Sequence, residues 1–495
     1  MDSLDIVYTP SGYDSCYKSL LKTLYNVNNL LKNKSKEGIS APADSSLDGI
    51  RTLYRLVDHP LDSVKTIHVG GTNGKGSTSH KIAQCLQSYG YKTGLFVSPH
   101  LSSFRERIQI DNVLISEEDL IAYSKRVLTL CVQHNITATL FELTFIIASV
   151  YFKALNCDFV VLEVGCGGIY DATNVVATSL SIICSVSLDH TKVLGSTVEE
   201  IALNKSGIFK HNKHGLIGPG CPYDVCKQEA DRRGAHLHTL QEVITTNNHV
   251  DWHDLIEFSS SMTYADASNN IIDTDKLNSA ISISALILLK TYYPEYDRII
   301  IDDNIVTRIV RKRPPCRWEL HQVLVNVNGQ VMLSPTDADD TIGTSSDNPF
   351  PVDVIFDVGH NPAAISALAR RIKTELSHRI VHVIYGVSRD KDVRQCLKQV
   401  LSVVSDTCIH FTHSSSYRAV STLQLKKLFQ EETGKELDDF GATGITDTVK
   451  RVLLVAAAQS SQNKSPPVVI ICGTGFILPE ARQAIGIIES IDESV

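Results

Sequence analysis

The segment "VKTIHVGGTNGKGSTSHKIAQCLQSYG", residues 64–90, decides the fold of the N-terminal half of the chain. Its apolar start is typical of a buried strand, a glycine-rich turn follows, and the rest has the apolar spacing of a helix that ends near Gly90. The turn departs from the common G-x-x-x-x-G-K-[ST] pattern, because Val69 and Gly76 stand where a glycine and a hydroxyl residue are usual. A strand, a glycine turn and a helix N-terminus direct backbone N–H groups to one point, which suits a phosphate chain. The segment therefore predicts a phosphate-binding loop whose sequence differs from the common pattern. A glycine turn with a purely structural role is the alternative.

Each residue type in this loop has a use in binding phosphate. Lys75 would supply a positive charge, and Ser77 or Thr78 would supply a hydroxyl. Gly71, Gly74 and Gly76 would allow positive φ angles and a close approach of the backbone to the ligand.

Composition narrows the class of protein. The chain has 495 residues, of which 43% are hydrophobic and 21% charged, so two or three globular domains are expected. A net charge of −8 gives no basic surface for nucleic acid or an anionic membrane, and no apolar run is long enough to span a membrane. The N-terminal residues lack the features of a signal or transit peptide, so we expect a cytoplasmic protein. The 12 cysteines contain no C-x-x-C pair and are expected to be reduced thiols.

Short apolar runs alternate with helical stretches along the chain. The N-terminal half has runs that are apolar on both faces, as in parallel strands covered by helices, at 93–98, 157–165 and 180–187. After residue 300 the alternation restarts, with strand-like runs at 352–359, 380–387, 406–413 and 466–475. The fold class is therefore α/β, with a phosphate-loop domain followed by a second, doubly wound domain.

The boundary between these domains is expected near the Pro314-Pro315 pair. We assign residues 1–305 to the N-terminal domain, 306–320 to a linker or hinge, and 321–495 to the C-terminal domain. The polar insert 334–349 predicts a mobile loop.

Polar side chains follow the predicted strands of the first domain. Ser98 and Glu163 lie at or near strand ends, and His190 lies just past a third strand. Because ligands bind at the carboxyl ends of strands in open α/β sheets, these residues are candidates to contact a ligand there. Thr197 and Glu200 form a T-x-x-E capping box, which predicts a helix from 197 to near Gly207 with Lys205 on its apolar face.

Five motifs occur in the order found in the folylpolyglutamate synthase and dihydrofolate synthase family, which belongs with the Mur ligases. They are "GTNGKGS" (71–77), "FVSPHLSSFRERIQI" (96–110), "VLEVGCGGIYDATNV" (161–175), "SLDHTKVLGSTVEEIALNKSGIFK" (187–210) and "FDVGHNPAA" (356–364). The chain resembles this family of ATP-dependent amide ligases over about residues 47–480. The resemblance implies a phosphate-loop ATPase domain of Mur-ligase type and a Rossmann-like glutamate-ligase domain. It also implies that a glycine directly after the loop lysine is the usual sequence pattern of this family.

The resemblance implies a role for each matching residue. ATP would contact Gly71, Thr72, Asn73, Gly74, Lys75, Gly76, Ser77, Asn278, Arg317 and Asn361. Magnesium, expected as two ions, would bind Ser98, Glu163 and His190, and a monovalent cation is also allowed. Lys205 would be carbamylated and would help to organise the second magnesium. Lys75, Lys205, Asp357 and His360 would be the catalytic residues, with Asp357, His360 and Asn361 meeting nucleotide and glutamate.

The chain departs from the family pattern at several positions. Ser206 follows Lys205 where the family has alanine, and Arg389 replaces a lysine in "YGVSRDKD". Thr274-Asp275 stands for the family's His-Gln pair. Cys316 replaces the glycine before Arg317, so the linker backbone is expected to differ there.

Forming an amide at neutral pH requires the carboxylate to lose an oxygen as phosphate, so ATP must first phosphorylate it. The amine of L-glutamate then attacks the acyl phosphate. Asn73 and Asn361 resemble the residues that members accepting 7,8-dihydropteroate have at these positions. This resemblance favours dihydrofolate synthase activity, with additional folylpolyglutamate synthase activity on reduced folates. The alternatives are an enzyme that only extends folates, a Mur-type peptidoglycan ligase, and a non-enzymatic ATP-binding module. We expect a monomer that acts on small molecules.

Overall fold

The computed structural model describes residues 17–25, 47–247, 250, 252, 274–302, 309, 313–326, 328–334, 349–437, 444–460, 465–489 and 492. The chain divides between Lys312 and Arg313 into two compact units, called here the first and second units. Most of the polar insert predicted at 334–349 lies outside the described residues. Within the described part of the chain, none of the helices combines the length and the apolar character that crossing a membrane requires.

The first unit is built on an eight-stranded sheet with the order β4-β3-β2-β5-β1-β6-β7-β8. Its strands are β1 (Lys65–Gly70), β2 (Thr93–Phe96), β3 (Ile108–Ile110), β4 (Val113–Leu114), β5 (Phe159–Glu163), β6 (Leu180–Ile183), β7 (His214–Ile217) and β8 (His236–Thr239). The six strands from β2 to β8 in this order are parallel, whereas β3 and β4 add an antiparallel edge. The parallel strands and their apolar runs agree with the sequence prediction, and the antiparallel edge was not predicted.

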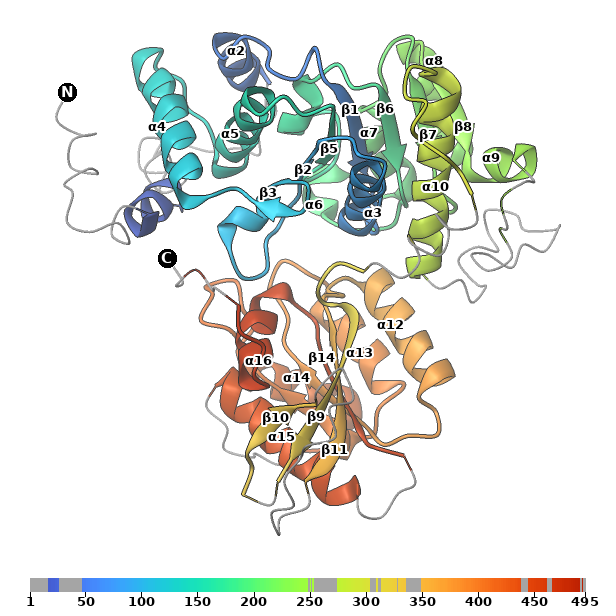
Figure 1. Ribbon diagram of the computed structural model, residues 1–495. Coiled ribbons are helices and arrows are strands. Elements are labelled where there is room, and N and C mark those ends of the chain that lie inside the picture. The colour runs from blue at the N-terminus through green and yellow to red at the C-terminus, as the bar shows by residue number, and fades with distance from the viewer. Residues whose placement is uncertain are drawn as a thin grey trace. The chain divides into compact units, whose positions relative to one another are not determined.

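Helices cover both faces of this sheet (Figure 1). They are α2 (Asp48–Leu56), α3 (Lys75–Ser88), α4 (Glu117–Gln133), α5 (Leu140–Ala154), α6 (Thr191–Leu194), α7 (Val198–Ser206), α8 (Tyr223–Arg233), α9 (Leu240–Thr246) and α10 (Thr274–Tyr292). Short 3₁₀ turns are η2 (Phe104–Arg107) and η3 (Ala172–Val175), and residues 17–25 are also helical. Two predictions are confirmed here: α3 follows the glycine turn, with Gly90 at a φ of 79° just past its end, and α7 begins with the Thr197–Glu200 capping box.

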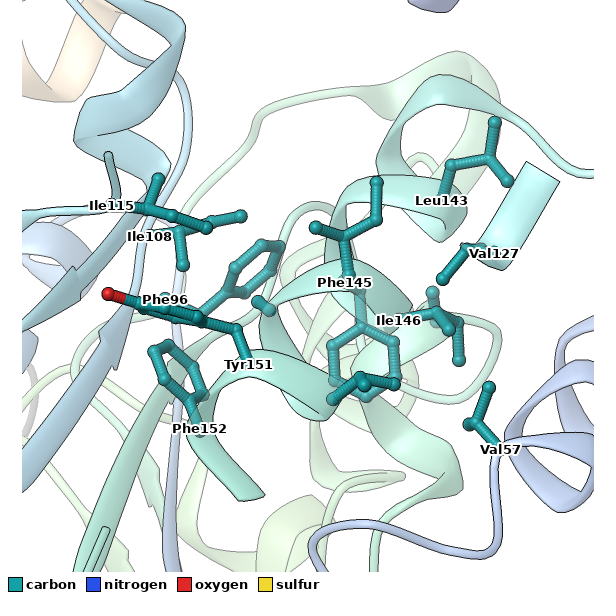
Figure 2. Packing of buried hydrophobic residues seen from close by; sticks show 14 of the residues in the cluster. Val57, Phe96, Ile108, Ile115, Val127, Leu143, Phe145, Ile146, Tyr151 and Phe152 are labelled. Carbon is teal, nitrogen blue, oxygen red and sulfur yellow. The ribbon is translucent and has the colours of Figure 1, made fainter. Parts of the chain in front are cut away.

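Alternate side chains of the central strands enter different cores. Phe159 and Val161 of β5 belong to the cluster that α3 and α10 cover, whereas Val160 and Leu162 belong to the cluster beneath α4 and α5. Figure 2 shows part of the second cluster, where Phe145 and other aromatic side chains pack among aliphatic ones. Burial of both faces explains why successive residues of β5 are apolar up to Glu163.

The second unit contains a six-stranded sheet with the order β10-β9-β11-β14-β12-β13. Its strands are β9 (Arg317–Val325), β10 (Val331–Leu333), β11 (Phe350–Asp357), β12 (Val381–Tyr385), β13 (Ile409–Phe411) and β14 (Val468–Cys472). Its helices are α12 (Pro362–Glu375), α13 (Val393–Leu401), α14 (Thr422–Thr433), α15 (Ile445–Ser460) and α16 (Leu478–Ala484), with 3₁₀ turns η5 (Asp406–Cys408) and η6 (Gly475–Ile477). Strands β11, β14, β12 and β13 are parallel, and β9 runs antiparallel to β11. Because β9 begins at Arg317, residues 317–320 of the predicted linker belong to a strand of this unit.

Candidate active site

The glycine turn between β1 and α3 is held in place by the chain that follows β6. The N–H of Thr72 donates to the carbonyl of Ser185 at 2.8 Å, and its hydroxyl donates to the carbonyl of Ser187 at 3.1 Å. The N–H of Asn73 donates to the Ser185 hydroxyl at 3.1 Å. The two serines were not among the predicted site residues. Their position just past a parallel strand is the signal that would have identified them.

Two glycines of the loop leave room for particular neighbours. A Cβ on Gly74, whose φ is 87°, would lie 2.4 Å from Oδ1 of Asn278, so the structure brings this predicted ATP ligand against the loop. A Cβ on Gly76 would lie 3.5 Å and 3.6 Å from the two carboxylate oxygens of Glu163. Glycine after the lysine therefore keeps the start of α3 open toward Glu163, whereas a side chain there would enter that space.

The two predicted catalytic lysines of the first unit meet at one carbonyl oxygen. Nζ of Lys75 lies 3.0 Å from the carbonyl oxygen of Gly71, and Nζ of Lys205 also lies 3.0 Å from it. Lys205 is buried, as its place on the apolar face of α7 predicted. Burial, and secondarily the charge of Lys75, lowers the pKa of Lys205 to about 8. A substantial neutral fraction of this amine therefore exists near neutral pH.

Lys205 is positioned by the glycine segment that follows β5. A Cβ on Gly168 would lie 2.6 Å from the carbonyl oxygen of Lys205, so α7 packs directly on this segment. The segment is held by the buried Asp171, whose Oδ2 accepts the N–H of Cys166 at 3.0 Å and whose Oδ1 accepts the N–H of Thr173 at 3.0 Å. Sequence reasoning did not single out Asp171, although an acid just after a glycine segment is a typical backbone cap.

The predicted metal ligands are brought together only in part. Glu163 ends β5, and its Oε2 accepts the N–H of Ser98 at 2.8 Å, so these two residues share one edge of the sheet. His190 is the N-cap of α6 at a φ of 51° and is exposed, with Nε2 3.9 Å from Oδ2 of Asp189. Among the described residues, no group of three or more His, Cys, Asp or Glu side chains could hold a metal.

The chemistry of Glu163 and Ser98 suits a hard metal ion. The Glu163 carboxylate is a hard oxygen donor, Ser98 contacts it through its backbone N–H and carries a second such donor in its hydroxyl, and Gly76 leaves the space in front of the carboxylate open. Mg²⁺ prefers such ligands and commonly completes its shell with water and substrate phosphates. The residues present therefore fit Mg²⁺, and the place of His190 in its shell stays a prediction.

Three predicted residues of the second unit, Asp357, His360 and Asn361, lie at the turn between β11 and α12. Asp357 ends β11 and accepts the N–H of Gly359 at 2.8 Å and the N–H of Trp318 at 3.1 Å. Burial raises the pKa of Asp357, while the Gly359 N–H and Arg317 act in the opposite direction. Asn361 is buried and caps α12 by accepting the N–H of Ala364 at 2.9 Å. The carboxylate and the amide thus shape the turn that presents the half-buried His360.

Arg317 is the exposed first residue of β9 and pairs in register with Asp357. Cys316, which precedes it, has a φ of 57°, in the left-handed region that favours glycine. The cysteine therefore stands in a backbone conformation that favours glycine, and a difference of the linker backbone from that of the family stays a prediction.

Comparison with known proteins places these features in a family. Residues 69–263 match the Mur ligase middle domain, and residues 342–475 match the Mur ligase glutamate ligase domain. The dihydrofolate synthase/folylpolyglutamate synthase of Escherichia coli is 30% identical over 341 residues, which cover 68% of this chain and 71% of the relative. The chain belongs to the dihydrofolate synthase/folylpolyglutamate synthase family. It is accordingly an ATP-dependent ligase.

Other members of the dihydrofolate synthase/folylpolyglutamate synthase family match over more of the chain. The Bacillus subtilis protein of the same name is 28% identical over 448 residues, covering 88% of this chain and 94% of the relative. A solved structure of Escherichia coli FolC in complex with DHPP and ADP is similar with a TM-score of 0.68 at 24% identity, and covers 94% of this chain and 97% of that one. At this identity the structural likeness supports the family fold.

Proposed function

We propose that this chain joins L-glutamate to 7,8-dihydropteroate at the expense of ATP, and that it also adds glutamate to reduced folates. The observation that carries the proposal is the convergence of the Gly71–Gly76 loop, Glu163 and Lys205 at one edge of the first sheet. The names of the Escherichia coli and Bacillus subtilis relatives include both activities, and the FolC structure is a complex with DHPP and ADP.

The residues of the loop suit the first half-reaction. Backbone N–H groups at the start of α3 and the ammonium of Lys75 bind the phosphates, so that the substrate carboxylate can attack the terminal phosphorus. The carboxylate oxygen forms the new bond to phosphorus, and ADP leaves. Mg²⁺, held by Glu163 and Ser98, would supply positive charge that neutralises the phosphates.

The second half-reaction is amide formation. The neutral amine of glutamate attacks the acyl carbon, inorganic phosphate leaves, and the nitrogen loses one proton and keeps the other as the amide N–H. His360, which the Asp357 turn presents in the second unit, is our candidate to contact nucleotide and glutamate, together with Arg317 and Asn361.

We further propose that Lys205 carries a carbamate. A neutral amine adds CO₂ to give a carbamate and a proton, and the lowered pKa of Lys205 leaves about a tenth of the amine neutral at pH 7. The product is a buried oxygen ligand with a negative charge. It would relieve the juxtaposition of two cations on the Gly71 carbonyl oxygen.

The test is ADP release with ATP, glutamate and either dihydropteroate or tetrahydrofolate. We expect release with dihydropteroate and slower release with tetrahydrofolate. Release with tetrahydrofolate alone would identify the alternative, an enzyme that only extends folates. Release with neither pterin substrate would reject the proposal.

A further inference from the structure

Arg107 lies at the same sheet edge as the metal-ligand candidates, although none of the predicted roles includes it. It is the last residue of η2, directly before β3. Its carbonyl oxygen accepts the N–H of Val97 at 3.1 Å, which places it beside the chain that leaves β2. The next residue of that chain is Ser98, whose N–H donates to Glu163.

The guanidinium of Arg107 is held from one side. Its Nε donates to Nδ1 of His100 at 2.8 Å, and its central carbon lies 5.4 Å from the centre of the Phe104 ring. Because arginine only donates, Nδ1 of His100 accepts, and Nε2 carries the proton that faces the Tyr25 hydroxyl at 3.2 Å.

The two terminal nitrogens of Arg107 differ from Nε in their hydrogen bonding. In the part of the chain that the structure describes, neither of them donates a hydrogen bond, although the charges of Glu163 and Glu106 act on the guanidinium. The carboxylate of Glu106 is engaged by backbone N–H groups, including that of Ser102 at 2.7 Å. A half-buried guanidinium whose planar fork is unfilled is suited to bind an oxyanion in a bidentate manner.

The strand order indicates which oxyanion this is. Arg107 precedes β3, the phosphate loop follows β1, and the order β3-β2-β5-β1 places Glu163 of β5 between them. At about 4.8 Å between neighbouring strands, β3 and β1 are roughly 14 Å apart. Phosphates bound at Lys75 and an oxyanion bound at Arg107 would therefore reach the space in front of Glu163 from opposite sides, and the acceptor oxygen and the terminal phosphorus could meet there.

We propose that the terminal nitrogens of Arg107 bind the substrate carboxylate that is to be phosphorylated. This inference rests on the proposed function and adds to it a residue that recognises the acceptor. His100 fixes the plane of the guanidinium, and the N-terminal helix at 17–25 contributes Tyr25 to that arrangement.

The experiment measures binding of dihydropteroate, by its fluorescence, to the full chain in the presence of a non-hydrolysable ATP analogue. Arg107→Ala and Arg107→Lys are compared with Arg105→Ala, a matched control in the same turn. Arg105 donates instead to the carbonyl of Ile115 at 3.3 Å and lies 3.9 Å from Glu117. The methyl ester of dihydropteroate serves as a ligand that lacks the negative charge.

We expect Arg107→Ala to weaken binding of dihydropteroate about 10- to 100-fold, the range for losing hydrogen bonds between charged groups. The same variant should bind the methyl ester and the ATP analogue as the wild type does, which also shows that it is folded. Arg107→Lys should lie in between, and Arg105→Ala should behave as the wild type.

Two results would overturn the inference alone. These are an Arg107→Ala variant that binds the acid normally while the wild type releases ADP, and one that loses the acid, the ester and the ATP analogue equally. A wild-type enzyme that binds no dihydropteroate and releases no ADP with either pterin substrate would overturn the proposed function, and this inference with it.

Discussion

Replacing Gly76 by alanine should separate folding from catalysis. Gly76 is the second residue of α3, and the new methyl group would lie 3.5 Å from the nearer Glu163 oxygen, an ordinary van der Waals distance. The fold can therefore accept the methyl group. The space between the helix and the carboxylate, where we place phosphate and Mg²⁺, would be reduced.

The expected effects of Gly76→Ala on stability and on activity have opposite signs. Alanine in a helix is more stable than glycine by about 0.5–1 kcal/mol, so the free energy of unfolding should stay the same or rise by up to about that amount. Activity should fall about 100- to 1000-fold, the range seen when one preorganised electrostatic contact to a transition state is lost. The Mg²⁺ concentration that gives half-maximal activity should also rise.

The assay combines urea unfolding with ADP release over a range of Mg²⁺ concentrations. Gly49→Ala is the matched control, because Gly49 is the second residue of α2 and its Cβ would meet one atom, the Thr137 carbonyl oxygen at 3.6 Å. This control should gain similar stability and keep full activity. An active Gly76→Ala enzyme with an unchanged Mg²⁺ requirement would refute the assignment of this space to phosphate and metal.

The other predictions concern charged residues of the first unit. Lys75→Ala should lower turnover by roughly two to four powers of ten without changing the far-UV circular dichroism, and retention of more than about a tenth of turnover would contradict its phosphate role. Glu163→Gln should raise the Mg²⁺ requirement in an activity titration, whereas an unchanged titration would remove it from the metal site. Since the neutral fraction of Lys205 grows as pH rises through about 8, the same concentration of dissolved CO₂ should reactivate CO₂-depleted enzyme better at pH 8.5 than at pH 6.5, and equal reactivation would count against the carbamate. Lys81→Met should destabilise the first unit by about 3–5 kcal/mol in urea unfolding, because it removes the buried ammonium that lies 3.2 Å from the Asp275 carboxylate; a loss below about 1 kcal/mol would show that the pair is dispensable.

The strands and helices that carry the site could be predicted because each is buried on a face with a clear period. The runs that became β5 and β14 are apolar except for the final Glu163 of β5, and β1 is buried along nearly its whole length; this pattern is typical of parallel strands between two helical layers. The antiparallel strands could not be predicted in this way. Strand β4 has two residues and lies at the edge, and most residues of β9 are half-buried or exposed, so neither produces a continuous apolar run.

The candidate site likewise contains features that the sequence could predict and features that it could not. Glu163 lies at a strand end, where strand-end reasoning applies, whereas His190 comes seven residues after β6 and its position depends on the intervening loop. The meeting of Lys75 and Lys205 on the Gly71 carbonyl oxygen depends on packing between α7 and the glycine segment 165–168, which local sequence does not specify. Arg107 was within a quoted motif, but its unfilled fork is visible only when its neighbours are known.

The start of β9 has a mechanical consequence. The chain enters the second unit at Arg313, and within a few residues the carbonyl of Cys316 accepts the N–H of Val358 while the N–H of Trp318 donates to Asp357. The entering segment is therefore fastened directly to the turn that presents His360, with no slack chain in between. A displacement of the chain at Arg313 would therefore be transmitted to that turn through these two hydrogen bonds.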